Sequence, residues 1–434
     1  METRIIAIEK PAAGGYGLGR LDGQAVLVAG ALAGEEMEIE ILARRAGAVM
    51  ARPVRVLVPH PERQEPVCPR FLDCGGCQLM HLADQAQPAL KFEVLKETLA
   101  HALVAVPHPT AIRPSPQPLF YRNRVRLKVA SQQGRLRLGF FAGRSRRLVA
   151  LDFCHLLTPR LNELLPHLAV WLDEMAGETG APDQIEILAG RPEEGFLLVA
   201  DLPAKPSARL DKWLGAGPAV PAPVKTFYSV QGRLKIPARL DPSVAMTVLE
   251  DPVSGLRLKA GPGAFTQVNP EVNLSLVRDV AQTAREVGAE QALDLYCGLG
   301  NFTLPLARVV RYAAGFDESP HAIAGARLNQ EANRLVNARF TRQRTETAVK
   351  DLAGQGRTFD LVVLDPPRSG ARGLAPDLAR LRPRHILYVS CHPAALARDL
   401  IELRSVGFSL KRLTAYDMFP QTAHLEVLAL LARG

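Results

Sequence analysis

The chain has 434 residues, of which 47% are hydrophobic and 22% are charged. This composition is ordinary for a soluble globular protein, and the length exceeds what one hydrophobic core usually supports, so we expect two or three domains. There is no apolar run long enough for a membrane helix and no signal-peptide pattern, which predicts a cytoplasmic protein without a membrane partner. The net charge of +9 fits either an ordinary basic surface or a polyanionic partner.

The N-terminal segment, residues 1–55, has the pattern of a small β-domain. Its predicted strands are the short stretches 5–9, 25–28, 36–41 and 54–58. Glycines at positions 14, 15, 17 and 19 predict a first turn, and Asp22-Gly23 predicts a hairpin. The prolines that follow residue 58 indicate a linker.

Residues 56–258 form the predicted central domain, which begins with a cluster of cysteines. A helix is expected at 84–105, where it can pack on the following domain, and a strand pair is expected at 123–130 and 136–140. The stretch 202–224 is rich in proline, alanine and glycine, which predicts a loop.

In the C-terminal domain, residues 259–434, short apolar runs alternate with helical stretches. The runs are 292–297, 313–317, 339–341, 361–364 and 386–390, and two last strands are expected at 408–415 and 425–431. Such alternation predicts a parallel sheet with helices on both faces, which is an α/β fold of the Rossmann-like class.

The first apolar run leads into a glycine turn, Asp294-Leu295-Tyr296-Cys297-Gly298-Leu299-Gly300-Asn301. The glycines allow close approach of a ligand, but their spacing is neither that of a dinucleotide site nor that of a phosphate loop. The turn therefore fits a nucleoside ligand without a pyrophosphate, such as S-adenosylmethionine, or a plain structural turn. Asp317 and Asp365 end two further strands, and ligands of such sheets bind at the carboxyl ends of strands.

Cys391 and Glu426 are the candidate reactive groups. Cys391 ends the fifth apolar run, which fits either a buried structural thiol or a nucleophile at the sheet edge where the acids lie. A helix that begins near Pro393 would direct its N-terminus at the sulfur and favour a thiolate. Glu426 enters an otherwise apolar strand, which fits either a salt bridge or a general base.

Nearly the whole chain resembles the bacterial RNA uracil-C5 methyltransferases, most closely their 23S ribosomal RNA branch with an iron–sulfur cluster. Beside the glycine turn, the motifs are Phe265-Thr266-Gln267-Val268-Asn269, Ser390-Cys391-His392-Pro393-Ala394, and Asp417-Met418-Phe419-Pro420 followed by His424-Leu425-Glu426. The resemblance implies an N-terminal OB-like TRAM β-barrel that binds RNA, a central α+β iron–sulfur domain and a C-terminal S-adenosylmethionine-dependent methyltransferase domain.

The resemblance also implies the residues of the site. Those that match the family's S-adenosylmethionine contacts are Gln267, Tyr296, Asn301, Asp317 and Asp365. Phe265 matches a residue that stacks on the flipped base, Cys391 matches the nucleophile, and Glu426 matches the proton acceptor. In the implied reaction a thiolate adds to uracil C6, C5 attacks the methyl donor, and a base removes the C5 proton to give 5-methyluridine.

Three positions depart from the family pattern. His392 stands where asparagine is usual, Asp317 where glutamate is usual, and Arg344 where asparagine or aspartate often contacts adenine. We therefore leave Arg344 outside the predicted site. The departures concern how the cofactor is held rather than the reaction.

The cysteines of the central domain have the spacing of a metal site. Cys68, Cys74 and Cys77 form C-x5-C-x2-C, and Cys154 follows much later. Four thiolates suit zinc or an iron–sulfur cluster, and spacing alone barely separates the two. The resemblance implies a [4Fe–4S] cluster. Because methyl transfer needs no electron, its expected role is to staple the domain or to order an RNA-binding surface.

A run of basic residues follows the cysteines. Period-two spacing places Arg122, Arg124, Arg126 and Lys128 on one strand face, and the further arginines are Arg135, Arg137, Arg144, Arg146 and Arg147. The run fits either a solvated face or a row of phosphate contacts. We predict that charge reversal at Arg124 and Arg126 weakens RNA binding and leaves cofactor binding unchanged. The target base must be unstacked to reach the nucleophile.

The predicted function is therefore methylation of a specific uridine in 23S ribosomal RNA, with no obligate protein partner evident. The nearest alternative is the same reaction on transfer RNA. Cytosine-C5 methylation would place the nucleophile in a different motif. A non-catalytic RNA-binding or assembly factor would need neither Cys391 nor Glu426.

Overall fold

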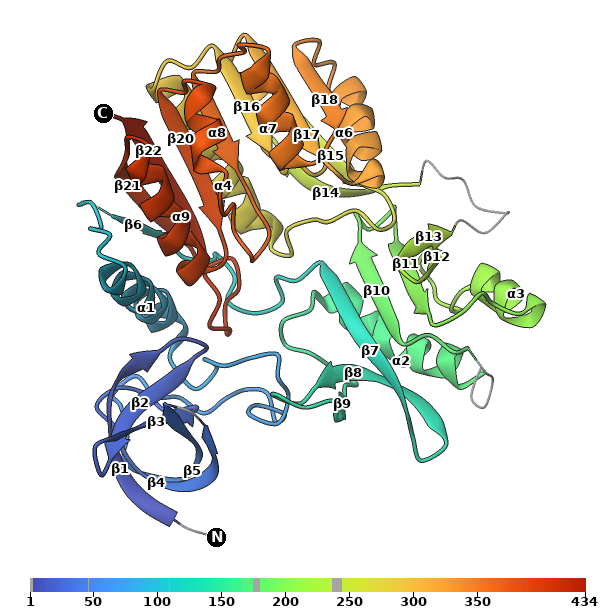
Figure 1. Cartoon of the computed structure of the whole chain (residues 1–434). Helices are drawn as coiled ribbons and strands as arrows, with labels where there is room; N and C mark the ends of the chain where they lie inside the picture. Colours follow the sequence, from blue (N-terminus) through green and yellow to red (C-terminus); the bar gives the residue numbers. More distant parts are fainter. Residues whose placement is uncertain (1–2, 46, 109, 175–179, 236–243) are drawn as a thin grey trace.

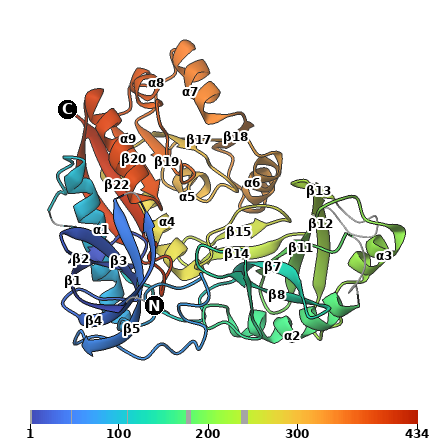
Figure 2. The same cartoon turned by 60° about the horizontal axis from the view of Figure 1, so that its bottom comes forward.

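The computed structural model describes residues 3–45, 47–108, 110–174, 180–235 and 244–434. An N-terminal barrel, a central sheet and a C-terminal α/β domain follow one another along the chain (Figure 1). In both views the barrel and the central sheet lie on either side of the segment 59–83, which carries three of the cysteines (Figure 2). No helix among the described residues is long and apolar enough to cross a membrane.

Five strands close the barrel in the order β1-β2-β3-β5-β4. They are β1 (Thr3–Ala12), β2 (Tyr16–Leu21), β3 (Gln24–Ala29), β4 (Glu36–Arg45) and β5 (Ala48–Val58), so that the last strand continues past residue 55. Gly14 and Gly15 form the predicted turn before β2 with positive φ angles, whereas Gly17 and Gly19 lie within β2. A β-carbon on Gly17 would stand 2.7 Å from Ile8, and one on Gly19 would stand 2.4 Å from Ala7. These glycines therefore permit close packing of strands in a small barrel.

The central domain is built on a seven-stranded sheet in the order β13-β12-β11-β10-β7-β8-β9. Its elements are β7 (Arg124–Gln132), β8 (Arg135–Phe141), β9 (Leu148–Ala150), α2 (Pro159–Asp173), β10 (Gln184–Ala189), β11 (Phe196–Leu202), α3 (Ala208–Ala216), β12 (Val224–Val230) and β13 (Arg233–Lys235). The predicted loop at 202–224 is wrong in its middle, where α3 forms. Ser207 caps this helix, and Trp213 stacks on Trp171 of α2 with ring centroids 3.8 Å apart.

An eight-stranded sheet forms the C-terminal domain, in the order β18-β17-β16-β19-β20-β22-β21-β6. Its strands include β16 (Gln291–Leu295), β17 (Tyr312–Asp317), β18 (Ala338–Arg342), β19 (Leu361–Leu364), β20 (His385–Ser390), β21 (Phe408–Tyr416) and β22 (Glu426–Arg433). The helices are α4 (Pro270–Glu286), α5 (Thr303–Ala307), α6 (Pro320–Ala332), α7 (Thr345–Gly354), α8 (Ala375–Arg380) and α9 (Pro393–Ser405). Two apolar cores lie on the two faces of the sheet, so the predicted Rossmann-like fold is confirmed.

Pieces of the central segment complete this domain. The helix α1 (Gln87–His101) follows a short 3-10 turn, η1 (Asp84–Ala86), and buries Phe92, Leu95 and Leu99 in the same core as α9. The strand β6 (Ala111–Arg113) pairs in parallel with β21 and forms the sheet edge. On the other face, the hairpin of β14 (Met246–Asp251) and β15 (Leu256–Ala260) joins the core of α4. The strand β6 could not be predicted from the sequence, because three residues show too little periodicity.

Candidate active site

The carboxyl ends of four parallel strands meet where the strand order reverses, between β16 and β19. The strand β16 leads into the glycine turn, β17 ends on Asp317, β19 leads into Asp365, and β20 leads into Cys391. Glu426 begins β22 and reaches the same edge because this strand runs antiparallel beside β20. Ligands of open α/β sheets bind in this crevice. The topology therefore brings the predicted residues together.

One cavity at this edge holds most of the predicted site. It is lined by Phe265, Gln267, Tyr296, Asp317, Asp365, Cys391 and Glu426, among others. Asn301 does not line it, but lines an adjoining cavity that shares Gln267, Tyr296 and Asp365. The Asn301 side chain exchanges two hydrogen bonds with Asn273 of α4, at 2.9 and 3.0 Å. Asn301 is thus placed beside the main cavity rather than in it.

The glycine turn has the backbone geometry that close approach of a ligand requires. Tyr296, Gly298 and Gly300 have positive φ angles of 65°, 54° and 86°. The Asp317 carboxylate accepts hydrogen bonds from the amides of Gly298 at 3.0 Å and Ser319 at 2.8 Å. Since a carboxylate has about four acceptor sites, Asp317 can hold the turn and still accept hydroxyl groups from a ligand.

Asp294, the acid that opens the turn, lines neither cavity. It is 1% exposed, and its Oδ2 accepts a hydrogen bond from the Thr303 hydroxyl at 2.5 Å. Burial raises the pKa of Asp294 to about 8. Asp294 is therefore a buried support of the turn.

The surroundings of Cys391 disfavour its thiolate in the ligand-free protein. Burial, Glu426 and Asp365 raise the pKa of Cys391 to about 11, and Arg368 opposes this shift. The loss of hydration around the sulfur and the two neighbouring acids therefore oppose the thiolate that the N-terminus of α9 is predicted to favour.

The departure at His392 has a structural explanation. His392 is the N-cap of α9, and its ring Nδ1 accepts a hydrogen bond from the Ala395 amide at 3.1 Å. An asparagine oxygen caps helices in the same way. The imidazole therefore replaces one acceptor with another and keeps the loop after Cys391 in place.

The buried Glu426 and the half-buried Asp365 both act on the pKa of Cys391. Glu426 is 3% exposed, and its pKa lies well above the ordinary value because of burial and then of Asp365, while Arg368 lowers it. Burial raises the pKa of Asp365 to about 7. No ion pair of Glu426 is found within the described part of the chain, although the charge of Arg368 acts on it, and its role as a base stays a prediction. Each carboxylate disfavours the ionised form of the other, which adds to the effect of burial on the pKa of Glu426.

Two arginines of the cavity were not assigned from the sequence. Arg368 follows Asp365-Pro366-Pro367, lines the cavity, and lowers the pKa of both Cys391 and Glu426. The sequence did contain a signal for Arg368, because this arginine stands three residues after Asp365, the acid that follows a strand. Arg344 also lines the cavity, with a 72% exposed side chain 3.7 Å from Glu346. Its exclusion from the predicted site rested on residue type alone.

The cations of the basic strand β7 differ in exposure, because Arg124 is buried whereas the Arg126 side chain is 59% exposed. Arg124 is 8% exposed, donates to Glu186 of β10 at 2.6 Å, and lies 5.5 Å from the centre of the Phe265 ring. Arg126 pairs with the same carboxylate at 2.5 Å. The prediction that Arg124 faces phosphate is therefore wrong, because the neighbouring strand supplies an acid beside it.

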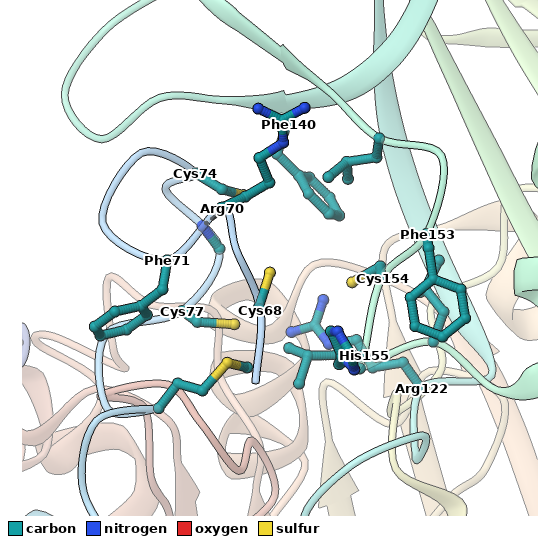
Figure 3. A pocket seen from close by; sticks show the side chains of 15 residues that line it. Cys68, Arg70, Phe71, Cys74, Cys77, Arg122, Phe140, Phe153, Cys154 and His155 are labelled. Atoms are coloured by element: carbon teal, nitrogen blue, oxygen red, sulfur yellow. Dashed lines mark hydrogen bonds between the residues drawn. The ribbon is translucent and has the colours of Figure 1, made fainter. Parts of the chain in front are cut away.

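The four cysteines of the predicted metal site line one cavity, separate from the active site. Figure 3 shows Cys68 and Cys77 on one side of this cavity and Cys154 on the other. Burial raises the pKa of Cys74, Cys77 and Cys154, and the neighbouring cysteines add to the shift. Among the described residues, no group of three or more His, Cys, Asp or Glu side chains is spaced to hold a single metal ion.

The strand order and the cavity at its switch point define a Rossmann-like methyltransferase. The crystal structure of Pyrococcus abyssi tRNA (uracil-54, C5)-methyltransferase in complex with S-adenosyl-L-homocysteine has the same fold. It aligns with a TM-score of 0.74 and 24% identity, over 98% of this chain and 100% of that chain.

Sequence comparisons identify the family. The family model described as tRNA (Uracil-5-)-methyltransferase matches residues 253–434. The 23S rRNA (uracil(1939)-C(5))-methyltransferase RlmD of Pseudomonas putida is 36% identical over 98% of this chain and 93% of its own length. The enzyme of the same name from Alkalilimnicola ehrlichii is 35% identical over 96% of this chain and 94% of its own. The chain belongs to the RNA uracil-C5 methyltransferase family, which confirms the resemblance.

Proposed function

We propose that the protein transfers a methyl group from S-adenosylmethionine to C5 of a uridine in 23S ribosomal RNA. The observation that carries the proposal is the shared cavity of Cys391, Asp365 and Glu426 beside the glycine turn. The substrate is supported by similarity, over almost the full length of both chains, to the Pseudomonas putida enzyme named for 23S rRNA. Transfer RNA is the second candidate, because the names of the family model and of the Pyrococcus abyssi enzyme include it.

The glycine-turn side of the cavity suits the methyl donor. Asp317 offers its remaining acceptor sites to ribose hydroxyls, and Gln267 and Tyr296 line the wall. When bound, S-adenosylmethionine supplies the methyl group. A cationic ligand in this cavity lowers the pKa of Asp365 and Glu426, since a nearby positive charge favours carboxylates.

Cys391 and Glu426 divide the reaction between them. The Cys391 thiolate adds to uracil C6, and C5 of the resulting enolate forms a bond to the methyl carbon. The bond from the methyl carbon to the donor's sulfonium sulfur breaks, its electrons stay on that sulfur, and S-adenosylhomocysteine is the leaving group. Glu426 then removes the C5 proton, the electrons of that C–H bond restore the C5–C6 double bond, and the sulfur leaves with the electrons of the C–S bond. Arg368 assists both stages, because it lowers the pKa of the thiol and of the acid.

The mouth of the cavity suits an unstacked base. The Phe265 side chain is 68% exposed there, and the Arg124 guanidinium lies against its ring. Aromatic side chains stack on bases that have left a helix, and single-stranded RNA makes such extrusion easier. Phe265 is therefore proposed to receive the target uracil or its neighbour.

The test is mass spectrometry of nucleosides after incubation of the protein with S-adenosylmethionine and a 23S rRNA transcript, with a tRNA transcript in parallel. We expect 5-methyluridine in the 23S transcript with the wild type and none with Cys391→Ala. 5-Methyluridine in the tRNA transcript alone would support the same reaction with tRNA as the substrate. No product in either RNA, from protein that binds S-adenosylmethionine, would contradict the function.

A second variant separates the two stages. Glu426→Gln is expected to form a covalent protein–RNA adduct that survives denaturing electrophoresis, because the methylated intermediate keeps its C5 proton and cannot release the sulfur. Adding Cys391→Ala to this variant should abolish the adduct. An adduct that persists without the thiol would remove Cys391 from the nucleophile role.

We infer that Cys68, Cys74, Cys77 and Cys154 hold a [4Fe–4S] cluster rather than zinc. Thiolates bind zinc at about 2.3 Å, which draws all four sulfurs around one point. The four cysteines line one cavity, and the resemblance to the iron–sulfur branch of the family supports a cluster, which offers one iron to each thiolate. When bound, it supplies a cross-link between the segment 59–83 and the loop after β9. Zinc without iron in anaerobically purified protein would contradict this assignment.

The cytoplasmic location stays a prediction from the sequence.

A further inference from the structure

The loop 417–425 joins β21 to β22 and contributes Phe419 to one side of the active-site cavity. Tyr416 and Glu426, which flank it, lie opposite each other in register. Phe419 lines the cavity with Cys391, and its ring meets His424 edge-on with centroids 6.0 Å apart. The loop contains no helix or strand, so other parts of the chain must hold its shape.

Helix α1 holds the first half of this loop through a buried ion pair. The Lys91 Nζ donates to Asp417 Oδ1 at 2.6 Å and to the Phe419 carbonyl at 2.9 Å. The side chains of Lys91 and Asp417 are only 1% and 5% exposed. A buried cation is costly unless it is paired, and both partners of this cation belong to the loop.

Gln87, one turn earlier on α1, holds the second half. Its Nε2 donates to Gln421 Oε1 at 2.9 Å, and its Oε1 accepts from the Gln421 amide at 2.8 Å. Gln421 is 1% exposed and has a positive φ of 68°. Such a backbone conformation is unfavourable for a residue with a side chain, and persists where the surroundings impose it.

The segment that carries the cysteines reaches the same residue of the loop. Directly after Cys77, the amides of Gln78 and Leu79 donate to the Gln421 carbonyl at 2.9 and 3.0 Å. The Gln78 side chain accepts from the Ala423 amide at 3.2 Å. In the first turn of the barrel, a β-carbon on Gly15 would stand 2.6 Å from Gln78. The barrel, the cysteine segment and α1 therefore converge on one active-site loop.

We propose that Lys91 and Gln87 of α1 are positioning residues that hold the loop 417–425 and thereby keep this side of the active-site cavity in its reactive shape. Neither side chain lines the cavity, so their effect on the reaction must pass through the loop. The inference rests on the proposed function, since it concerns the rate of that reaction.

The test compares Lys91→Met with Lys96→Met, which changes an exposed lysine on the same helix. For each protein we would measure kcat and KM for the RNA, the Kd of S-adenosylmethionine by calorimetry, and the melting temperature. We expect Lys91→Met to lower kcat by about tenfold or more and to change the donor Kd less than about twofold, because small displacements of reacting groups cost rates of this order. Lys91→Arg keeps the charge and should recover part of kcat, whereas Lys96→Met should match the wild type.

Lys91→Met leaves the Asp417 carboxylate buried and unpaired, which threatens folding. A second variant, Lys91→Met combined with Asp417→Asn, removes both charges and keeps the test decisive. Loss of kcat with intact donor binding in either variant supports the inference. A double variant with wild-type kcat overturns it while leaving the proposed function in place. A wild-type protein that methylates neither RNA overturns the proposed function and this inference together.

Discussion

Within the active-site cavity, Arg368 is the cation that opposes the effect of burial on both reactive groups. Burial, Glu426 and Asp365 raise the pKa of Cys391 to about 11, and the Arg368 guanidinium lowers it. The same charge lowers the pKa of Glu426. The proposed reaction needs a thiolate first and a carboxylate afterwards, and one cation near both groups favours each ionised form.

Replacing this cation should make Cys391 harder to ionise. Arg368→Met removes the charge that lowers the pKa of Cys391, so the pKa should rise further above its ordinary value. At a given pH below that pKa the thiolate fraction then falls, and alkylation by iodoacetamide slows between about pH 8 and pH 10, since only the thiolate reacts. Peptide mass spectrometry of the ligand-free protein would follow the rate at Cys391. Arg372→Met, which changes an exposed arginine of the same loop, is the control, and equal rates in both variants would contradict the role of Arg368.

At the scale of elements, the sequence departures and the basic strand have structural roles. The His392 ring caps α9 and so holds the loop after the nucleophile. On the central sheet, Glu186 of β10 binds Arg124 and Arg126 of β7. A cation that pairs across two strands stabilises the sheet, and only cations left exposed are available to RNA.

The cap at α9 can be tested by two substitutions at one position. His392→Ala should lower the free energy of unfolding by about 1 kcal/mol, because the first turn loses its acceptor. His392→Asn supplies another acceptor and should stay close to the wild type. Thermal melting of both variants measures the difference. Equal losses of stability would mean that the imidazole acts through packing rather than through capping.

The basic residues should separate into structural and RNA-contacting groups. Arg124→Met should destabilise the protein by roughly 1–3 kcal/mol, because it removes a charged partner from a mostly buried carboxylate. Arg146→Met changes an exposed arginine of the β8–β9 loop and should leave stability unchanged. It should weaken RNA binding and reduce the salt dependence of the affinity. A stable Arg124→Met protein with weakened RNA binding would restore the original prediction for this strand.

At the scale of the whole molecule, the C-terminal methyltransferase domain is completed by elements that lie earlier in the chain. The helix α1 contributes Phe92, Leu95 and Leu99 to one core, and β6 forms the edge of the sheet. The loop 417–425 is held by α1 and by the cysteine segment. The chain therefore folds its N-terminal half partly into its C-terminal domain.

Fragments of the chain should reflect this arrangement. A fragment of residues 244–434 lacks α1 and β6 and exposes the core that α1 covers, at a cost of about 1.5–3 kcal/mol for each large apolar side chain left in water. We expect it to aggregate or to unfold without cooperativity. A chain that lacks only residues 1–58 keeps α1 and β6 and should bind S-adenosylmethionine. Circular dichroism melting and calorimetry would measure both, and a shorter fragment that melts cooperatively and binds the donor would contradict the expectation.

The sequence by itself determined the class of fold and named candidate site residues that, except for Asn301, line the cavity. These features follow from local patterns: alternating apolar runs predict parallel strands, and acids at strand ends such as Asp317 and Asp365 must meet at one sheet edge. The motif around Cys391 and the turn after Asp294 could also be recognised from the sequence, because each consists of a few consecutive residues.

Only the tertiary structure decided the features that depend on contacts between distant residues. The burial of Arg124 against Glu186 needed the neighbouring strand, and the raised pKa of Cys391 needed the desolvation and charges of the assembled cavity. Lys91 and Asp417 stand 326 positions apart, and no local pattern links them. Packing decides how well a side chain is hydrated and which charges lie near it. The pKa shifts of the cavity and the support of the active-site loop could therefore be identified only in the folded chain.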